Sequence, residues 1–233
     1  MGTKERKERE KEARKEEIIS AAEKVFFQKG LVAATMDEIA ELAELSKGTI
    51  YLYYKSKEDL YLAVSIRGLE VMFQLFQKAV SNGQSTIQQI ANLGEAYYEF
   101  FKNNREYFRM FIFFENPRLQ TQVSEEMKEQ CSISERKVWG LVTGLIQRGI
   151  DEGMLHQGLD PLEAGVMLWS NSNGLMRLMD RQDDYWVERV GLNLENTLRK
   201  SNAFLVESMM TEKAHELHGK MLFYHDNEDS KTQ

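Results

Sequence analysis

Three lysines, Lys47, Lys55 and Lys57, fall close together in a segment that is also rich in hydroxyl side chains. Lysine ammonium groups and hydroxyl groups both donate hydrogen bonds, so such a set suits the binding of phosphate oxygens. Lys47 and Gly48 also fall where the first turn of a helix is expected, and the outward amides of such a turn attract phosphate. The chemistry predicted for this segment is therefore binding to a phosphate backbone.

Three helix-start signals position these side chains. Thr35 and Glu38 form a capping-box pattern, Ser46 can cap a second helix, and Ser56 with Asp59 marks a third start. Two short helices followed at once by a long one are typical of a DNA-binding helix-turn-helix, which predicts double-stranded DNA as the partner.

The apolar spacing supports these short helices. The first carries the stripe Ile39, Ala40, Leu42 and Ala43, and Leu45 in the turn is expected to fill the space between the helices. In the second helix Ile50 is expected to face inward. Thr49, Tyr51 and Tyr53 are then expected to point outward, while Tyr54, four residues after Ile50, is expected in the core.

The segment resembles the TetR family of transcriptional regulators. The resemblance rests on the run from Ala43 to Leu60, AELSKGTIYLYYKSKEDL, preceded by Thr35 and by FFQKG at 26–30, and covers about residues 14–64. Glu44 stands where the family often has glycine. If this turn requires a positive φ, Glu44 costs about 1 kcal/mol, which favours a tighter or right-handed turn.

The resemblance implies an all-α fold of about nine to ten helices and a one-component transcriptional regulator. We interpret it as a repressor that binds a palindromic DNA operator as a homodimer and is released by a small apolar or amphipathic effector. The alternative is a dimeric DNA-binding regulator without a small-molecule ligand, controlled by a protein partner. Carried over residue by residue, the motif implies phosphate contacts from Thr35, Ser46, Lys47, Tyr51 and Lys57 and base-edge contacts from Gly48, Thr49 and Tyr53; Lys55 joins this set through its charge.

The chain of 233 residues is expected to divide into a basic arm (1–15), a helix-turn-helix domain (16–60), an effector-binding and dimerisation domain (61–210) and a polar tail (211–233). The arm is read either as a phosphate or minor-groove contact or as a solvated, partly frayed helix start. The spacing of apolar residues predicts helices over 16–28, 57–80, 86–101, 107–114, 121–152, 161–178 and 186–210, with a short one after 211.

Composition agrees with an intracellular regulator. The net charge of −7 arises outside residues 1–67, which hold 13 basic and 13 acidic residues, so the predicted DNA-binding end is neutral. The charged N-terminus and the lack of a long apolar run predict no secretory signal and no membrane span. A single cysteine, Cys131, fits a reducing cytoplasm.

The resemblance also implies an effector pocket in the middle of the chain, where methionine and aromatic side chains are frequent. Such side chains suit an adaptable apolar cavity, although any one of them is more often core. Asn171 and Asn173 interrupt an apolar helix and could orient a ligand or pair across a dimer interface. The effector-binding set is Met72, Phe73, Phe76, Tyr97, Phe101, Phe108, Phe111, Trp139, Met167, Trp169, Asn171 and Asn173.

The first of the last two long helices is apolar on nearly all sides, and the second repeats apolar residues every three or four positions, so both have faces to bury. The resemblance to the family implies that these two helices form the dimer interface. The dimer set is Val166, Leu175, Met179, Val190, Leu194, Leu198, Leu205 and Met209. We expect no catalysis, cofactor or metal. His215 and His218 share a helix face near His225 but have no fixed third ligand, and Cys131 is expected to be a buried apolar residue.

Overall fold

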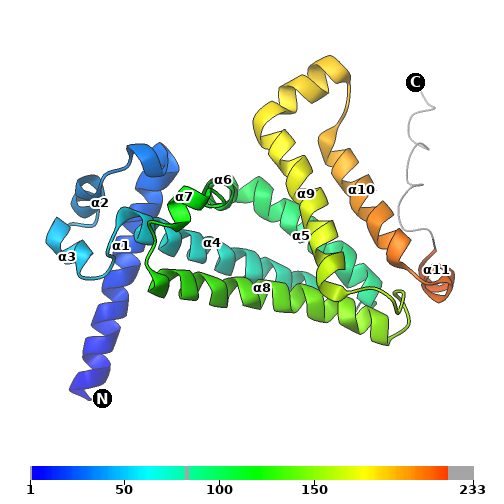
Figure 1. Ribbon diagram of the computed structural model, residues 1–233, viewed down its shortest axis with the longest axis horizontal. Helices are drawn as coiled ribbons and strands as arrows, with labels where there is room; N and C mark the ends of the chain where they lie inside the picture. The colour runs from blue at the N-terminus through cyan, green and yellow to red at the C-terminus, as the bar shows by residue number, and fades with distance from the viewer. Residues whose placement is uncertain (1, 82–83, 220–233) are drawn as a thin grey trace. The chain divides into compact units, whose positions relative to one another are not determined.

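The computed structural model describes residues 2–81 and 84–219, and these are almost entirely helical (Figure 1). Eleven α-helices and one π-helical segment, η1, occur in this part of the chain, with no strand and one isolated bridge between Leu155 and Met210. The all-α prediction is confirmed, with somewhat more helices than expected. The helices are α1 (Thr3–Ala33), α2 (Met36–Leu42), α3 (Lys47–Tyr51), α4 (Lys57–Val80), α5 (Thr86–Asn103), α6 (Arg105–Phe114), α7 (Pro117–Gln120), α8 (Glu125–Asp151), α9 (Pro161–Asp184), η1 (Tyr185–Val190), α10 (Leu194–Met209) and α11 (Glu212–His218).

The chain forms two compact units. The first contains the residues up to Val71 together with Asn104–Arg136, and the second contains Met72–Asn103 and the residues from Lys137 onward. Helices α4 and α8 contribute to both. The Asn82-Gly83 stop, His225 and the end of the tail predicted from the sequence lie outside the described residues.

Local capping signals position the first helices as predicted. Thr35 accepts a hydrogen bond from the backbone amide of Glu38, whose carboxylate accepts from the amide of Thr35. Ser46 accepts from the amide of Thr49 at the start of α3, and Ser56 accepts from the amide of Asp59 at the start of α4. These caps satisfy amides that have no partner within the helix, so they define where each helix begins.

The helix-turn-helix closes over a small apolar core. Ile18 of α1, Ile39 of α2, Ile50 of α3 and Leu60 of α4 are fully buried. Leu42 is an exception to the predicted stripe, since 48% of its surface is exposed. The buried face of α2 is spaced as Met36, Ile39 and Ala40, and at 100° per residue Leu42 falls well to one side of it.

Three helices of the first unit meet at Arg67. Its guanidinium donates to the carboxylates of Glu16 (2.6 Å) and Glu23 (2.7 Å) of α1, and the hydroxyl of Tyr107 of α6 donates to Glu23 (2.9 Å). Gly68 makes room for this arrangement, because a Cβ atom there would lie 2.6 Å from the ring of Tyr107. The sequence pattern did not reveal this cluster, since its members are far apart in the chain.

Helix α1 begins at Thr3, so the prediction of a start near Glu16 is wrong. Lysine, arginine, glutamate and alanine all have high helix propensity, which makes residues 4–15 good helix formers despite their lack of an apolar face. Ion pairs one turn apart, such as Arg6 with Glu10 and Lys15 with Glu12, support the helix further. Gly30 has the expected positive φ (70°), but its ψ of 173° is extended and not left-handed helical, and one more turn then leads to Ala33.

The C-terminal helices differ from the prediction in their ends. Helix α8 begins at Glu125 rather than near 121, after the short helix α7. Helix α9 continues past 178 to Asp184, and α10 begins at Leu194 rather than near 186. The segment between them turns at Gly191 (φ 73°), and Asn193 then caps α10 by accepting from the amide of Asn196. Gly191 and Asn193 are ordinary stop and start signals that the apolar periodicity across this region obscured.

In the second unit α9 packs against α10 and α5. A fully buried layer includes Met176 and Leu198. Beside it lies a polar layer, in which the amide of Asn171 donates to the side chains of Ser201 and Asn202 and the hydroxyl of Ser172 lies 3.0 Å from the Asn202 amide oxygen.

The turn between α2 and α3 is left-handed at Glu44 (φ 55°), so the expectation of a tighter or right-handed turn is wrong. The amide of Glu44 donates to the Glu41 carbonyl and that of Leu45 to the Ala40 carbonyl, which is the Schellman hydrogen-bond pattern. That pattern requires a left-handed residue at position 44. The two hydrogen bonds it provides outweigh the strain of a non-glycine residue.

We therefore expect Glu44→Gly to stabilise the protein by about 0.5 to 1 kcal/mol, because relief of backbone strain exceeds the added flexibility of the unfolded chain. Urea denaturation followed by circular dichroism measures the change. Glu41→Gly is the matched control at an exposed helical position, where glycine is expected to destabilise by about 1 kcal/mol. Equal losses in both variants would contradict the strain at Glu44.

Candidate nucleic-acid interface

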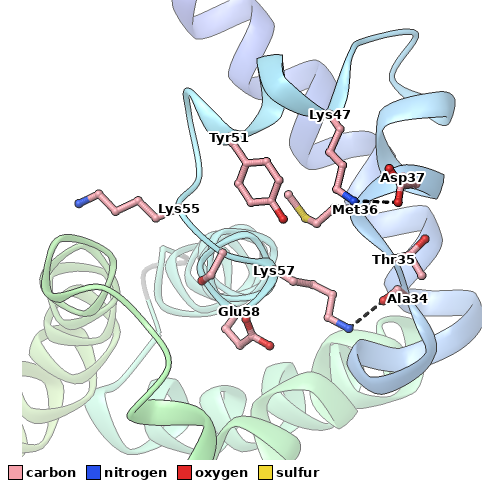
Figure 2. A pocket seen from close by; sticks show the side chains of 10 residues that line it. Ala34, Thr35, Met36, Asp37, Lys47, Tyr51, Lys55, Lys57 and Glu58 are labelled. Carbon is pink, nitrogen blue, oxygen red and sulfur yellow. Dashed lines mark hydrogen bonds and ion pairs between the residues drawn. The ribbon is translucent and has the colours of Figure 1, made fainter.

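The lysines singled out in the sequence surround one shallow, open pocket of about 530 Å³ in the first unit (Figure 2). The end of α1, the start of α2, helix α3 and the start of α4 line it. Figure 2 shows Lys47, Tyr51, Lys55 and Lys57 around this pocket, with Asp37 and Glu58 among them. The structure thus brings four of the predicted DNA-binding side chains, together with Thr35, to one surface.

Lys47 is paired with Asp37 across the helix-turn-helix. The two charged groups are 2.8 Å apart and both side chains are largely exposed, 46% and 72%. The hydrogen bond that the ammonium of Lys47 donates to the Asp37 carboxylate raises the pKa of Lys47, so this ammonium stays charged throughout the physiological range. An exposed pair of this kind contributes little stability, so Lys47 can exchange Asp37 for a phosphate at low cost.

Lys55 and Lys57 are held differently. The ammonium of Lys55 lies 3.6 Å from Glu126 of α8, with both side chains about 70% exposed. The ammonium of Lys57 donates to the carbonyl oxygen of Ala34 at 2.8 Å, next to the end of α1. Lys55 is therefore available for an anion, whereas Lys57 stabilises a carbonyl that the helix itself cannot satisfy.

The hydroxyl groups of the predicted set serve as caps. Besides receiving the Glu38 amide, the Thr35 hydroxyl lies 3.0 Å from the Glu38 carboxylate. The lowered pKa of Glu38, caused by hydrogen bonds from Lys29 and then Thr35, keeps this cap ionised. The Ser46 hydroxyl lies 2.8 Å from that of Thr49. Their contacts with phosphate or bases stay predictions.

The aromatic residues divide as expected from their spacing. Tyr54 is 6% exposed, which confirms it as a core residue, and burial raises the pKa of its hydroxyl. Tyr51 is 45% exposed on the side of the pocket, and Tyr53 is half-buried. A Cβ atom at Gly48 would meet only the Ser46 side chain, at 3.7 Å, so the chain presents open backbone there.

Sequence reasoning missed the role of Asp59. Its carboxylate accepts a hydrogen bond from the backbone amide of Ser124 at 2.7 Å and is 2% exposed. In a capping box the carboxylate of Asp59 would accept a hydrogen bond from the amide of Ser56. Here the carboxylate instead caps the start of α8. The two residues are far apart in sequence, so no local signal identifies the pair.

The residues predicted to bind an effector are distributed over both units. Phe108, which is buried, and Phe111, which is half-buried, belong to the first unit. In the second unit Phe76 and Tyr97 pack edge to face with their ring centroids 6.3 Å apart. Met72 and Phe101 are also buried, and Phe73 is half-buried.

The remaining members of the effector set lie on α8 and α9. Trp139 and Trp169 have ring centroids 6.2 Å apart, and Trp169 and Met167 are exposed by 40% and 54%. Asn173 lies 3.5 Å from the Tyr97 hydroxyl, and Asn171 is satisfied by α10. Both asparagines thus have hydrogen-bond partners within one chain, which neither interpretation from the sequence anticipated.

The predicted dimer set contains both exposed and buried residues. Val166 and Val190 are exposed by 41% and 50%, and Leu175 and Leu205 are half-buried. The structure places Met179, Leu194, Leu198 and Met209 in the core of one chain, because each is at most 6% exposed, rather than on a surface open to a second copy. Phe204 of α10 and Leu162 of α9, which the predicted dimer set does not include, are both more than half exposed.

Other chemistry is sparse in the described residues. Cys131 is buried as expected, and burial, followed by the nearby Glu135, raises the pKa of its thiol to about 12. His215 and His218 lie on α11, and no group of three potential metal ligands occurs within residues 2–81 and 84–219. In the same residues no helix combines the length and the apolar composition of a membrane span.

Comparison with known proteins agrees with this geometry. Residues 18–64 match the family model of bacterial regulatory proteins, tetR family. Over 155 residues, 66% of this chain and 78% of the relative, the chain is 32% identical to the HTH-type transcriptional regulator YhgD of Bacillus subtilis. It is 29% identical over 134 residues, 57% of this chain and 60% of the relative, to the HTH-type transcriptional activator FasR of Mycolicibacterium smegmatis.

A solved structure extends the similarity of fold beyond the matched segment. The transcriptional regulator FadR from Bacillus subtilis in complex with stearoyl-CoA aligns with a TM-score of 0.60 at 19% identity, covering 84% of this chain and 97% of that one. At this identity the alignment speaks to the fold alone.

Asp37 provides a test of the lysine-lined pocket. We expect Asp37→Asn to tighten binding to duplex DNA by about two- to fivefold, because it removes a negative charge beside the predicted phosphate contact and releases Lys47. Fluorescence anisotropy with a labelled duplex measures the affinity. Glu41→Gln removes the same charge from α2 outside the pocket and should have a smaller effect. Weaker binding by Asp37→Asn would mean that Asp37 instead positions Lys47 for its contact.

Proposed function

Because this chain belongs to the TetR family of bacterial regulatory proteins, we propose that it acts as a homodimeric, one-component regulator that binds a palindromic operator. The family consists of DNA-binding transcriptional regulators rather than enzymes. The observation that carries the proposal is the capped helix-turn-helix whose lysines and Tyr51 converge on one open surface. Helix α3 supplies the residues that would enter the major groove, and the lysines would neutralise the flanking phosphates.

The homodimer follows from the need to read a palindrome and from the exposed apolar side chains of the second unit. Val166 of α9 and Phe204 of α10 are among the apolar residues that one chain leaves uncovered. A twofold dimer would present two copies of α3 to half-sites about 34–36 Å apart, one turn of DNA.

We propose repression as the sign of control. FasR is named an activator, so activation is the alternative that transcription in vitro decides. A repressor lowers transcript from a template carrying the operator, and an activator raises it.

If these lysines bind phosphates, substituting Lys47 and Lys55 should weaken DNA binding alone, whereas substituting Lys57 should also lower stability. A duplex selected from a random pool by the wild-type protein serves as the probe. We expect Lys47→Gln/Lys55→Gln to weaken binding. The slope of log K against the logarithm of the salt concentration should become shallower by about 0.9 for each lost phosphate contact. Its thermal midpoint should stay unchanged, because both lysines form only exposed pairs.

Lys57→Gln is the comparison variant. Besides weakening DNA binding, and unlike the double variant, it should lower the free energy of unfolding by about 1 kcal/mol, since it removes the hydrogen bond to the Ala34 carbonyl. A double variant with unchanged affinity and salt dependence would contradict the assignment of this surface to DNA.

We also propose that a small apolar or amphipathic effector controls operator affinity and meets the second unit at Met72, Phe76, Tyr97 and Phe101. The FadR complex makes stearoyl-CoA the first probe, with coenzyme A as the control without an acyl chain and tetraphenylphosphonium as an apolar cation. An effector that binds the DNA-incompetent state about tenfold more tightly provides 1.4 kcal/mol of coupling.

We expect stearoyl-CoA to weaken duplex binding, and the duplex to weaken stearoyl-CoA binding by the same factor, because linkage is reciprocal. Anisotropy measures the first and isothermal titration calorimetry the second. A duplex affinity that none of the three compounds changes would contradict these effector classes and favour control by a protein partner.

A further inference from the structure

We propose that the N-terminal half of α1 binds the DNA backbone through one stripe of lysines, Lys4, Lys7 and Lys11, which we call the lysine stripe. This inference rests on the proposed function and adds a second contact surface to it. The stripe would contact phosphates beside the half-site that α3 enters, and would add affinity without adding base preference.

The spacing of the stripe places it on one face of the helix. Residues three and four apart lie above one another, and seven residues return almost to the same side. The spacing that joins Lys4 and Lys11 leads on to Ile18 and Val25, which are buried in the first unit. Lys29 continues the same face and pairs with Glu38 of α2. The lysine stripe therefore extends the side of α1 against which the helix-turn-helix packs.

The ion pairs of α1 distinguish the stripe from several other basic residues of the helix. Arg6, Arg14 and Lys15 each pair with a glutamate of the same helix. Within the residues that the structure describes, Lys4, Lys7 and Lys11 are exposed and form no ion pair. The stripe therefore gathers three exposed lysines without an ion pair on one face of the helix, although basic and acidic residues alternate along the sequence.

The helix holds this charge in a fixed position. The N-terminal half of α1 continues the packed part of the same helix without a break before Gly30 (Figure 1). At 1.5 Å per residue the stripe is about 10 Å long, which matches roughly three base pairs of duplex. A preformed helix loses less conformational entropy on binding than a flexible arm would.

Composition favours DNA over a membrane as the partner. Between residues 4 and 17 every side chain is charged except Ala13, and glutamates occupy the faces beside the stripe. A helix that lies on a lipid surface needs an apolar face to insert, and this segment has none. A phosphate backbone requires only the positive charge.

The test compares the full-length wild type with Lys4→Gln/Lys7→Gln/Lys11→Gln. The matched control is Arg6→Gln/Arg9→Gln/Lys24→Gln, which removes three positive charges from other faces of the same helix. The probe is the duplex selected by the wild-type protein, with long flanks and with the flanks trimmed away. Affinities are measured by anisotropy over a series of KCl concentrations, and circular dichroism checks that each variant keeps its helicity.

We expect the stripe variant to bind the long duplex more weakly, with a salt slope shallower by about 0.9 for each lost phosphate contact. Trimming the flanks should weaken the wild type but not the stripe variant, and the control should behave as the wild type does. A stripe variant with the wild-type slope, or a control that loses as much, would overturn the proposal. Loss of binding to phosphatidylserine vesicles with unchanged DNA affinity would overturn it in favour of a membrane. A wild-type protein that selects no duplex would refute the proposed function instead.

Discussion

The pairing of Arg67 with two carboxylates of α1 is the constraint on which the first unit depends. Arg67 of α4 contacts Glu16 and Glu23, and Tyr107 of α6 adds a further hydrogen bond to Glu23. Arg67 and Glu23 are about three-quarters buried, so loss of either partner would leave a charge short of water and of hydrogen bonds. Since arginine does not deprotonate in proteins, the contact persists over the whole physiological pH range.

Because Arg67 holds the direction of α1, it also determines what that helix can present. On one face α1 supplies Ile18 to the core beneath α2 and α3, and beyond the packed region it extends the lysine stripe along the same face. The lysine-lined pocket depends on α1 as well, since Lys57 binds the carbonyl of Ala34 that follows the helix. Any change in the direction of α1 would therefore alter the helix-turn-helix and the stripe together.

The sequence predicted most reliably those features in which a few neighbouring residues determine the outcome. Thr35 with Glu38, Ser46, Ser56 and Gly30 each satisfy a local geometric need, and the structure has all of them. The start of α1 was missed because a helix stabilised only by helix propensity and ion pairs has no apolar periodicity that would reveal it. The contact of Asp59 with Ser124 and the Arg67 cluster join distant segments, which one sequence cannot reveal. At Glu44 the hydrogen bonds of the turn overrode the preference of the residue.

The apolar residues of α9 in the second unit differ in whether their own chain covers them. Near the start of helix α9 the apolar side chains of Val166 and Trp169 remain exposed, whereas Met176 and Met179, further along the same helix, are covered by their own chain. The polar layer of Asn171, Ser172 and Asn202 sets the register between α9 and α10, because a sliding of one helix would leave half-buried amides unpaired. Gly94 supports this layer, since a Cβ atom there would lie 3.3 Å from the Asn202 amide. The exposed apolar residues near the start of α9 are thus fixed in position before any partner binds. That arrangement suits the proposed dimer, because the backbone that carries the uncovered side chains is already ordered before a second copy covers them.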